Sequence, residues 1–367
     1  MNYFSLFSGI GAFEKALDNQ AVPYELVGYC EIDKYASKSY AAIHGVPETL
    51  NVGDITKVDE KQLPHDIDLI TYGFPCQDIS NAGKQKGLYN EDGSLTRSGL
   101  FFEALRIIEE TQPRVAIAEN VKNLTGKRFA EQFKTVLESL EEAGYNNYWK
   151  VLNLKDFGVP QNRERVFIIS IRKDIDPGTF TFPTGFPLTI RLKDVLEDEV
   201  DEKFYLSIRE MNYMHRDSLG NYSSRWTYAN KQSAEKSVCL TANLHRGVPY
   251  NVLIEDDEPT VFQIGNCCPT KTRDNPNQGR IYATNGLAPA LNCMGGGNRQ
   301  PFVPEMRIRK LTPKECFRLM GFDDADYEKA ASVSSNTQLY KQAGNSIGVP
   351  VLEHIMAALF DCGALNR

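Results

Sequence analysis

The first part of the chain alternates short apolar runs with segments of helical periodicity. Up to about residue 172, each of the first four β-rich runs precedes a stretch whose apolar positions recur every three to four residues. The predicted strands are residues 3–7, 25–30, 69–73, 115–118 and 166–171. The predicted helices are residues 12–17, 34–44, 99–110 and 128–144. This alternation predicts an α/β fold with a parallel, helix-covered, Rossmann-like sheet.

The pattern changes after residue 173. Gly, Pro, Asn and Thr dominate residues 174–304, where helical periodicity occurs only at 190–196. We expect a smaller, irregular, β-rich domain there, because long loops usually carry recognition. Helical pattern resumes at Thr312, Pro313 and Glu315, which form a capping box with proline at the first helical position. An apolar helix at 351–360 is expected to pack back on the first domain.

These changes predict two domains, as does the length of 367 residues. The catalytic domain is predicted to be discontinuous, with residues 1–173 plus 338–367. Residues 174–337 are predicted to form the second domain and its hinge. A content of 41% hydrophobic and 24% charged residues is ordinary for a soluble globular protein.

Composition also limits the compartment and the metal chemistry. No apolar run approaches the roughly 20 residues of a membrane span, and no signal peptide is apparent, so we expect a cytoplasmic protein. The eight cysteines include no C-x-x-C pair and read as reduced thiols. Cys239, Cys267, Cys268 and Cys293 have the wrong spacing for zinc, so no metal site is predicted.

The net charge of −7 argues only weakly against a nucleic-acid partner. Local clusters matter more than total charge. One basic cluster contains Arg163, Arg165, Arg172 and Lys173, and a second contains Lys271, Arg273, Arg280 and Arg299. A polyanionic partner is therefore compatible with the sequence.

Candidate catalytic residues stand at the ends of three predicted strands. Cys76 follows the apolar run 67–74, Glu119 closes the run 114–118, and Arg163 and Arg165 precede the run 166–171. A lone cysteine is usually a small buried hydrophobe. A thiol, a carboxyl group and two guanidiniums at one edge of a sheet are instead typical of a nucleophile, an acid and an anion clamp facing one substrate.

A second group of residues predicts an adenosine-containing cofactor. Gly9 and Gly11 allow a ligand to approach the backbone at a helix N-terminus, although Glu14 replaces the third glycine of the dinucleotide fingerprint. Glu31 lies 20 residues after Gly11 and suits a ribose diol, and Asp54 suits an adenine amino group. An NAD-dependent oxidoreductase is one alternative, but it leaves the cysteine motif without a role.

Six motifs in order carry a resemblance to a known family. They are Phe7-x-Gly9-x-Gly11, Pro75-Cys76-Gln77, Glu119-Asn120-Val121, Gln161-x-Arg163-x-Arg165, Arg309-x-Leu311-Thr312 to Gly321-Phe322, and Gly344-Asn345-Ser346. In sequence and spacing they resemble the DNA (cytosine-5)-methyltransferase family of bacterial and phage restriction–modification systems. The middle region lacks the motifs, as expected of that family's variable target-recognition domain.

The resemblance implies S-adenosylmethionine as cofactor and duplex DNA as substrate. The cofactor-binding residues it implies are Phe7, Gly9, Ile10, Gly11, Glu31, Ile32, Asp54, Asn345 and Ser346. It also implies a mobile loop at 77–93, in which Gln77 and Ser80 fill the space left by a flipped-out cytosine. We expect a monomer, with any cognate restriction endonuclease acting separately.

The implied mechanism agrees with the residue types. Attack of the Cys76 thiolate on carbon 6 makes carbon 5 of cytosine nucleophilic, while Glu119 supplies a proton or hydrogen bond at ring nitrogen 3. Arg163 and Arg165 are expected to orient the base or its phosphate. Two further alternatives are an RNA-cytosine methyltransferase, against which the long middle region counts, and an inactive DNA-binding relative, against which the complete catalytic set counts.

Overall fold

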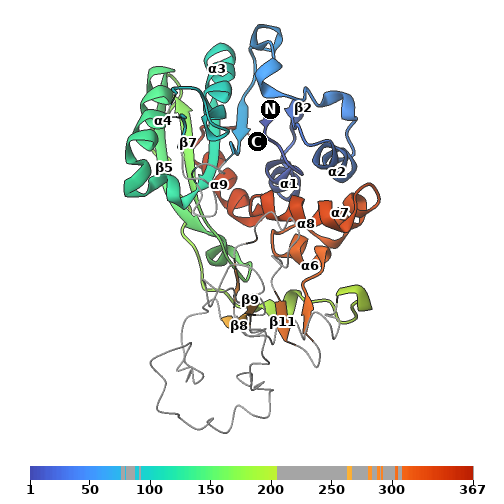
Figure 1. The fold of residues 1–367 in the computed structure, drawn as a ribbon. Coiled ribbons are helices and arrows are strands. Elements are labelled where there is room, and N and C mark those ends of the chain that lie inside the picture. The colour runs from blue at the N-terminus through green and yellow to red at the C-terminus, as the bar shows by residue number, and fades with distance from the viewer. Residues whose placement is uncertain are drawn as a thin grey trace, which may run out of the picture.

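The computed structural model describes residues 1–75, 79, 87–90, 92–204, 263–266, 280–282, 287–289, 291, 302–304 and 308–366. Its centre is a six-stranded sheet with the order β2-β1-β3-β4-β7-β5 (Figure 1). The strands are β1 (Asn2–Leu6), β2 (Glu25–Cys30), β3 (Leu69–Tyr72), β4 (Val115–Val121), β5 (Tyr145–Asn153) and β7 (Glu164–Arg172). The α/β class and all five predicted strands are confirmed.

The prediction of a wholly parallel sheet is wrong. Strands β1 to β4 are parallel, but β7 runs antiparallel to both β4 and β5. Only the short helix η7 (Leu154–Phe157) and the two-residue strand β6 (Gln161–Asn162) separate β5 from β7. A parallel neighbour needs a crossover of a dozen or more residues, so this connection can form only an antiparallel pair. The edge strand β5 was not predicted, since its middle is polar and largely solvent-facing.

Helices cover both faces of the sheet. The long helices are α1 (Ala12–Asn19), α2 (Lys34–His44), α3 (Phe101–Thr111), α4 (Ala130–Glu142), α7 (Asp324–Ala331), α8 (Asn336–Asn345) and α9 (Val349–Asp361). Side chains alternate between two cores: Val115 and Ile117 of β4 join the core beneath α1 and α9, whereas Ala116 and Ala118 join the core beneath α3 and α4. This alternation follows from the two-residue period of a strand.

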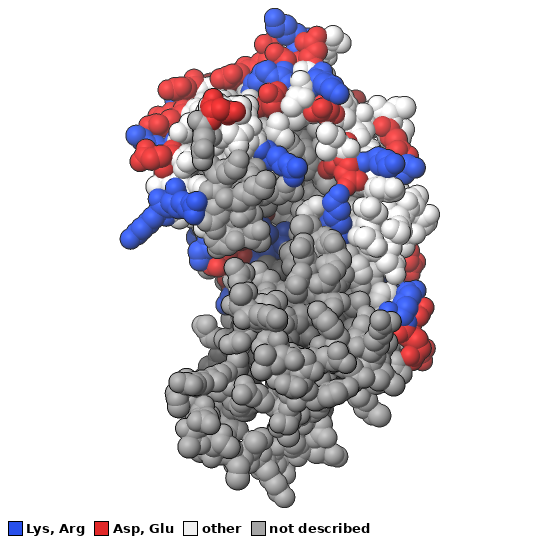
Figure 2. All heavy atoms as spheres, in the orientation of Figure 1, with Lys and Arg blue, Asp and Glu red and all other residues white. Residues whose placement is uncertain are grey.

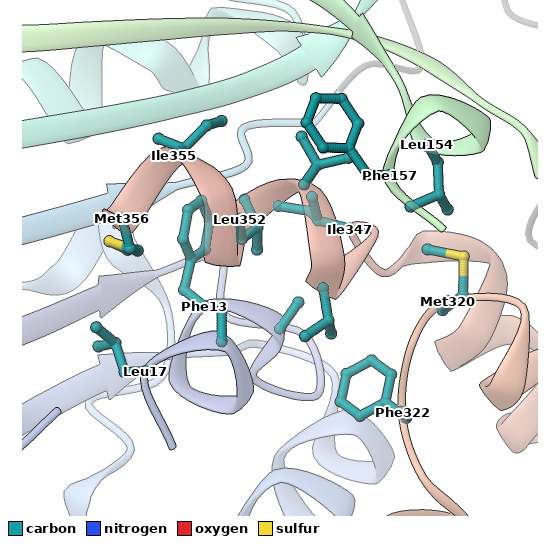
Figure 3. Close-up of a cluster of buried hydrophobic side chains, with 14 of the residues drawn as sticks. Phe13, Leu17, Leu154, Phe157, Met320, Phe322, Ile347, Leu352, Ile355 and Met356 are labelled. Carbon is teal, nitrogen blue, oxygen red and sulfur yellow. The ribbon is translucent and has the colours of Figure 1, made fainter. Parts of the chain in front are cut away.

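The C-terminal helix α9 lies against α1, as the sequence predicted. Figure 3 shows Phe13 and Leu17 of α1 facing Leu352 and Met356 of α9. The stretch Asn336–Asp361 is long and apolar enough to cross a membrane by length and composition alone, but 56% of its most apolar window is buried inside the protein. It also consists of two helices separated at residues 346–348. We therefore regard it as part of the protein core.

The capping box at Thr312 is confirmed at the start of α6 (Pro313–Arg318). The Thr312 hydroxyl accepts from the Glu315 N–H at 3.1 Å, and the Glu315 carboxylate accepts from the Thr312 N–H at 2.7 Å. The helix predicted at 190–196 is wrong in type and extent, because only the short 3₁₀ helix η8 (Leu192–Val195) forms there. Another 3₁₀ turn, η9 (Glu202–Phe204), follows.

The described parts of the middle region form a second, four-stranded sheet with the order β12-β11-β9-β8. Its strands are β8 (Gln263–Asn266), β9 (Arg280–Tyr282), β11 (Phe302–Pro304) and β12 (Ile308–Lys310). A further two-residue strand, β10 (Ala288–Pro289), pairs with β6 of the first domain. In Figure 1 this small sheet lies beyond α6, apart from the central sheet.

Candidate active site

The loop between β1 and α1 has a backbone that suits a closely approaching ligand. Phe7, Gly9 and Gly11 have φ values of 52°, 58° and 80°. A Cβ on Gly9 would meet no atom within 4 Å, whereas a Cβ on Gly11 would lie 2.1 Å from His44 Nε2. Gly11 is therefore required for packing, while Gly9 leaves open space at the start of α1. The loop lies at the carboxyl ends of parallel strands, where α/β folds bind their ligands.

Glu31 is held beside this loop. Its Oε2 accepts from the Gly9 N–H at 2.9 Å and its Oε1 accepts from the Asp33 N–H at 2.7 Å. Burial raises the pKa of Glu31, and the two backbone donors partly oppose that shift. Ile32, the next residue, has 76% of its surface exposed. A carboxylate beside an exposed apolar side chain suits a ribose and the face of an attached base.

Asn51 is a positioning residue that the sequence analysis missed. Its Oδ1 accepts from the N–H groups of Glu31 at 3.0 Å and Gly53 at 2.9 Å, and its Nδ2 donates to the Glu31 carbonyl at 2.9 Å. This side chain therefore ties Gly53, the residue before Asp54, to Glu31. Asp54 caps the 3₁₀ helix η2 (Ile55–Lys57), and hydrogen bonds from Thr56 lower its pKa.

Arg106 of α3 fixes the loop that follows Asp54. Its guanidinium donates to the carbonyls of Val58 at 2.9 Å and Ile55 at 3.1 Å. It also forms ion pairs with Glu60 and Glu103. These contacts tie residues 55–60 to the helix, so the position of Asp54 depends on a residue far from it in sequence.

The loop after α8 completes this edge of the sheet. Asn345 is exposed and Ser346 is buried, at 6% exposure. Ile347 comes close to β3, since a Cβ built on Gly73 would lie 3.5 Å from Ile347 Cδ1. The C-terminal motif thus reaches the end of the strand that leads to Cys76.

Glu119 and Arg165 form a buried pair. Arg165 Nε lies 2.9 Å from Glu119 Oε1, and their side chains are 17% and 11% exposed. Antiparallel pairing places Glu119 opposite Phe167 and Val121 opposite Arg165, so the two charged residues are diagonal neighbours on one face. Burial raises the pKa of Glu119, while the positive charges of Arg165 and then Arg163 lower it less. Glu119 can therefore hold a proton above the usual range of a carboxyl group.

The chain on both sides of Cys76 is anchored near Glu119. Asn120 Nδ2 donates to the Phe74 carbonyl at 3.0 Å, and Asn123 Nδ2 donates to the Ile79 carbonyl. A Cβ on Gly73 would lie 3.6 Å from Glu119 Oε2, so the absence of a side chain there leaves room beside the carboxyl group. Cys76, Gln77 and Ser80 themselves lie outside the described residues.

Arg163 is buried, at 3% exposure, and binds backbone carbonyls. Its Nη1 donates to Leu291 at 2.8 Å, and its Nη2 donates to Ser346 at 2.6 Å and Gly344 at 3.2 Å. Burial raises the pKa of Glu119, and the positive charge of Arg163 partly opposes that rise. The guanidinium of Arg163, however, points toward the main-chain carbonyls that it binds. Its expected contact with a base or phosphate stays a prediction. Among the basic residues expected near a nucleic acid, Lys271, Arg273 and Arg299 lie outside the described part of the chain.

No group of three or more His, Cys, Asp or Glu side chains within the described residues is arranged to hold a metal ion. The four cysteines considered for zinc lie outside those residues.

Comparison with known proteins identifies the family of the chain. The family model for C-5 cytosine-specific DNA methylases matches residues 1–361. The chain belongs to this family. It is therefore a DNA (cytosine-5)-methyltransferase, and the resemblance inferred from its motifs is confirmed.

Relatives and solved structures agree with this assignment. The chain is 37% identical to the orphan methyltransferase M.SPRI of Bacillus phage SPR, over 98% of this chain and 97% of that protein. It is 34% identical to the type II methyltransferase M.HhaI of Haemophilus parahaemolyticus, over 97% of this chain and 93% of that one. The crystal structure of S. pombe Dnmt2 has the same fold, with a TM-score of 0.62, 18% identity and 98% of both chains covered.

Proposed function

We propose that this methyltransferase transfers a methyl group from S-adenosylmethionine to carbon 5 of a cytosine flipped out of a specific duplex DNA sequence. The observation that carries the proposal is the buried Glu119–Arg165 pair. It lies beside β3, which ends at Tyr72 and leads to Pro75-Cys76, at the same edge as the Gly9 loop and Glu31. A carboxyl group that can hold a proton, the strand that leads to Cys76 and a loop with room for a ligand thus share one edge of the sheet, which supports the proposal.

Several residues fit S-adenosylmethionine. Gly9 leaves open space at the N-terminus of α1, Glu31 presents a fixed carboxylate for ribose hydroxyls, and the exposed Ile32 can cover one face of the adenine. Phe7, Ile10, Gly11, Asp54, Asn345 and Ser346 are proposed to complete the pocket. The cofactor supplies an electrophilic methyl group on a sulfonium ion. These residues bind it, orient it and keep it at the edge that bears Glu119.

Glu119 assists the attack on cytosine. The Cys76 thiolate forms a bond to carbon 6, and the electron pair of the carbon 5–carbon 6 double bond moves through the ring toward nitrogen 3. A protonated Glu119 donates to nitrogen 3 and stabilises that charge. Carbon 5 then accepts the methyl group and gives up its proton to water, the thiolate leaves carbon 6 with its electron pair, and nitrogen 3 returns its proton to Glu119, which restores the ring and the free enzyme. Arg165 keeps Glu119 in place throughout, and Gln77 and Ser80 are proposed to fill the vacated space in the duplex.

The covalent step is tested with DNA that carries 5-fluorocytosine at the target. Fluorine does not leave as a proton does, so the wild-type enzyme should become trapped on the DNA, whereas Cys76→Ala should bind DNA without trapping or transferring a methyl group. Cys362→Ala is the matched control, because that half-buried thiol lies at the end of α9. Full activity of Cys76→Ala, or failure of the active wild-type enzyme to trap, contradicts the mechanism.

We further propose that residues 1–173 and 338–367 form the catalytic domain, and that residues 174–337 recognise the target sequence and provide the hinge. The small sheet of β8, β9, β11 and β12 supports this division, because it is built apart from the central sheet. Figure 2 shows Lys and Arg side chains along the border of the described part on the face in view, where a polyanion can be held despite the net charge of −7. Exchanging residues 174–304 with those of a relative should change the methylated sequence and leave cofactor affinity unaltered.

A further inference from the structure

Two buried side chains just before β7, Gln161 of β6 and Arg163, hold one peptide of the middle region. The Leu291 N–H donates to Gln161 Oε1 at 3.0 Å, and the Leu291 carbonyl accepts from Arg163 Nη1 at 2.8 Å. Gln161 is fully buried and Arg163 is 3% exposed. Strand β10 adds main-chain pairing with β6 three residues before Leu291. We call Gln161, Arg163 and the peptide groups that they bind the 161–163 clasp.

The clasp also reaches the C-terminal part of the chain. Gln161 Nε2 donates to the Leu319 carbonyl at 2.5 Å, and Arg163 Nη2 donates to the carbonyls of Ser346 and Gly344. Two side chains therefore join the central sheet, the segment 287–291 and the loop proposed to contact the cofactor. Such a junction has little tolerance for displacement, because a buried amide or guanidinium that loses its acceptor carries a full desolvation cost.

The strand that follows the clasp, β7, carries Arg165, the partner of Glu119 on β4. Arg163, Arg165 and Phe167 project from one face of the chain by strand alternation, and Arg165 Nε lies 2.9 Å from Glu119 Oε1. A shift of the Leu291 peptide would move the start of β7, and with it the arginine that orients Glu119. The clasp is thus a short physical connection between the middle region and the proton donor.

We propose that Gln161 and Arg163 are positioning residues that couple sequence recognition by the middle region to the Glu119–Arg165 pair. The inference rests on the proposed role of residues 174–304 in recognition. Binding of the correct DNA keeps the Leu291 peptide in the clasp and thereby keeps Glu119 aligned for the chemical step. Arg163 then acts through the main chain, and not by contact with a base or phosphate. An incorrect sequence leaves this alignment incomplete, so discrimination appears in the rate of methyl transfer.

The test measures single-turnover methylation of a duplex with the target sequence, identified by bisulfite sequencing, and of a duplex with one altered base pair. Gln161→Met keeps the length of the side chain but removes its hydrogen bonds, and Arg163→Lys keeps the charge but loses the two-pronged geometry. In each variant we expect the ratio of the two rates to fall about tenfold, a typical size for coupling energies. DNA affinity should change by less than about threefold, since neither buried side chain faces the DNA.

A double variant and a control make the outcome decisive. Because both side chains act on one peptide, Gln161→Met and Arg163→Lys together should cost less than the product of the single effects. Arg172→Lys, at the far end of β7, should leave the ratio unchanged. Circular dichroism and thermal melting identify misfolded variants, for which Gln161→Asn, which retains an uncharged amide on a shorter side chain, is the milder replacement.

Three results would overturn the proposal. An unchanged rate ratio in a folded Gln161 variant means that the residue is merely structural. A loss of discrimination confined to Arg163→Lys, with independent single effects, indicates a direct DNA contact. A separate experiment tests whether residues 174–304 recognise the target. If they do not, exchanging them with those of a relative would leave the methylated sequence unchanged.

Discussion

Glu119→Gln is the sharpest perturbation of the site. It keeps the length of the side chain and leaves a carbonyl oxygen to face Arg165, but it removes the transferable proton. We expect the single-turnover rate of methyl transfer to fall by about 10²-fold or more, which is the usual range for general acid catalysis. A 10²-fold loss corresponds to about 2.7 kcal/mol of activation free energy.

The structure allows this catalytic loss to be separated from a loss of stability. Arg165 retains an acceptor in the variant and is itself 17% exposed, so the free energy of unfolding should fall by no more than about 1–2 kcal/mol. The folded state raises the pKa of Glu119, which means that it binds the proton more tightly than the unfolded chain does. The associated stabilisation is present below the unfolded pKa and is lost as pH rises through the folded pKa. The Gln variant should lack this pH dependence and gain in relative stability across that window.

The pH profile of the chemical step provides the assay. The wild-type rate should fall as pH rises through the raised pKa of Glu119, because the proton donor is then ionised. Arg165 is the larger of the two arginine effects that lower this pKa, so Arg165→Gln should move the alkaline limb to higher pH whatever it does to the maximal rate. Tritium transfer from labelled S-adenosylmethionine at saturating DNA measures the pH profile of the wild type and that of Arg165→Gln. An unchanged rate in Glu119→Gln, or an alkaline limb that Arg165→Gln does not move, would refute the assignment.

Three further predictions concern other parts of the molecule. Arg106→Gln should weaken S-adenosylmethionine binding about tenfold in calorimetry by loosening the loop after Asp54, and DNA affinity should stay the same. Lys134→Gln on the exposed face of α4 is the control, and equal effects of the two variants would contradict this prediction. Thr312→Ala should lower the free energy of unfolding in urea by about 1 kcal/mol through loss of the capping box, and a change within the error of the Lys134→Gln control would show that the cap is redundant. DNA affinity should fall steeply as the salt concentration rises. If Arg280 on β9 contacts a phosphate, Arg280→Ala should reduce the slope of log binding constant against log salt concentration by about one unit. A binding constant of the intact enzyme that does not change with salt would argue against DNA as substrate.

The strands and helices that carry the motifs were predictable because their signals are local. The runs at β1, β3 and β4 are apolar and end in turn residues, and the start of α6 follows from Thr312, Pro313 and Glu315 alone. The direction of β7 is not local. It depends on the short connection from β5, and β5 itself is hidden by its polar residues at the edge of the sheet.

Candidate site residues were predictable for the same reason, while their partners were not. Glu31 and Glu119 stand at strand ends, where sequence pattern and chemistry coincide. Asn51 and Arg106 resemble ordinary surface residues in sequence, and only the folded chain gives them several backbone carbonyls and N–H groups to bind. Arg163 illustrates the converse, since its motif indicated a ligand contact and the structure gives it main-chain acceptors.

The antiparallel direction of β7 also determines which residues meet at the candidate site. In a parallel sheet, the N-terminal end of a strand lies at the edge opposite to the carboxyl ends, far from a site built there. Because β7 is reversed, its first residues lie at the carboxyl edge, and Arg165 meets Glu119. The same reversal delivers Gln161 and Arg163 to the junction with Leu291 and Ser346. One change of strand direction thus places Arg165, the partner of Glu119, and the link to the middle region within a few residues of each other.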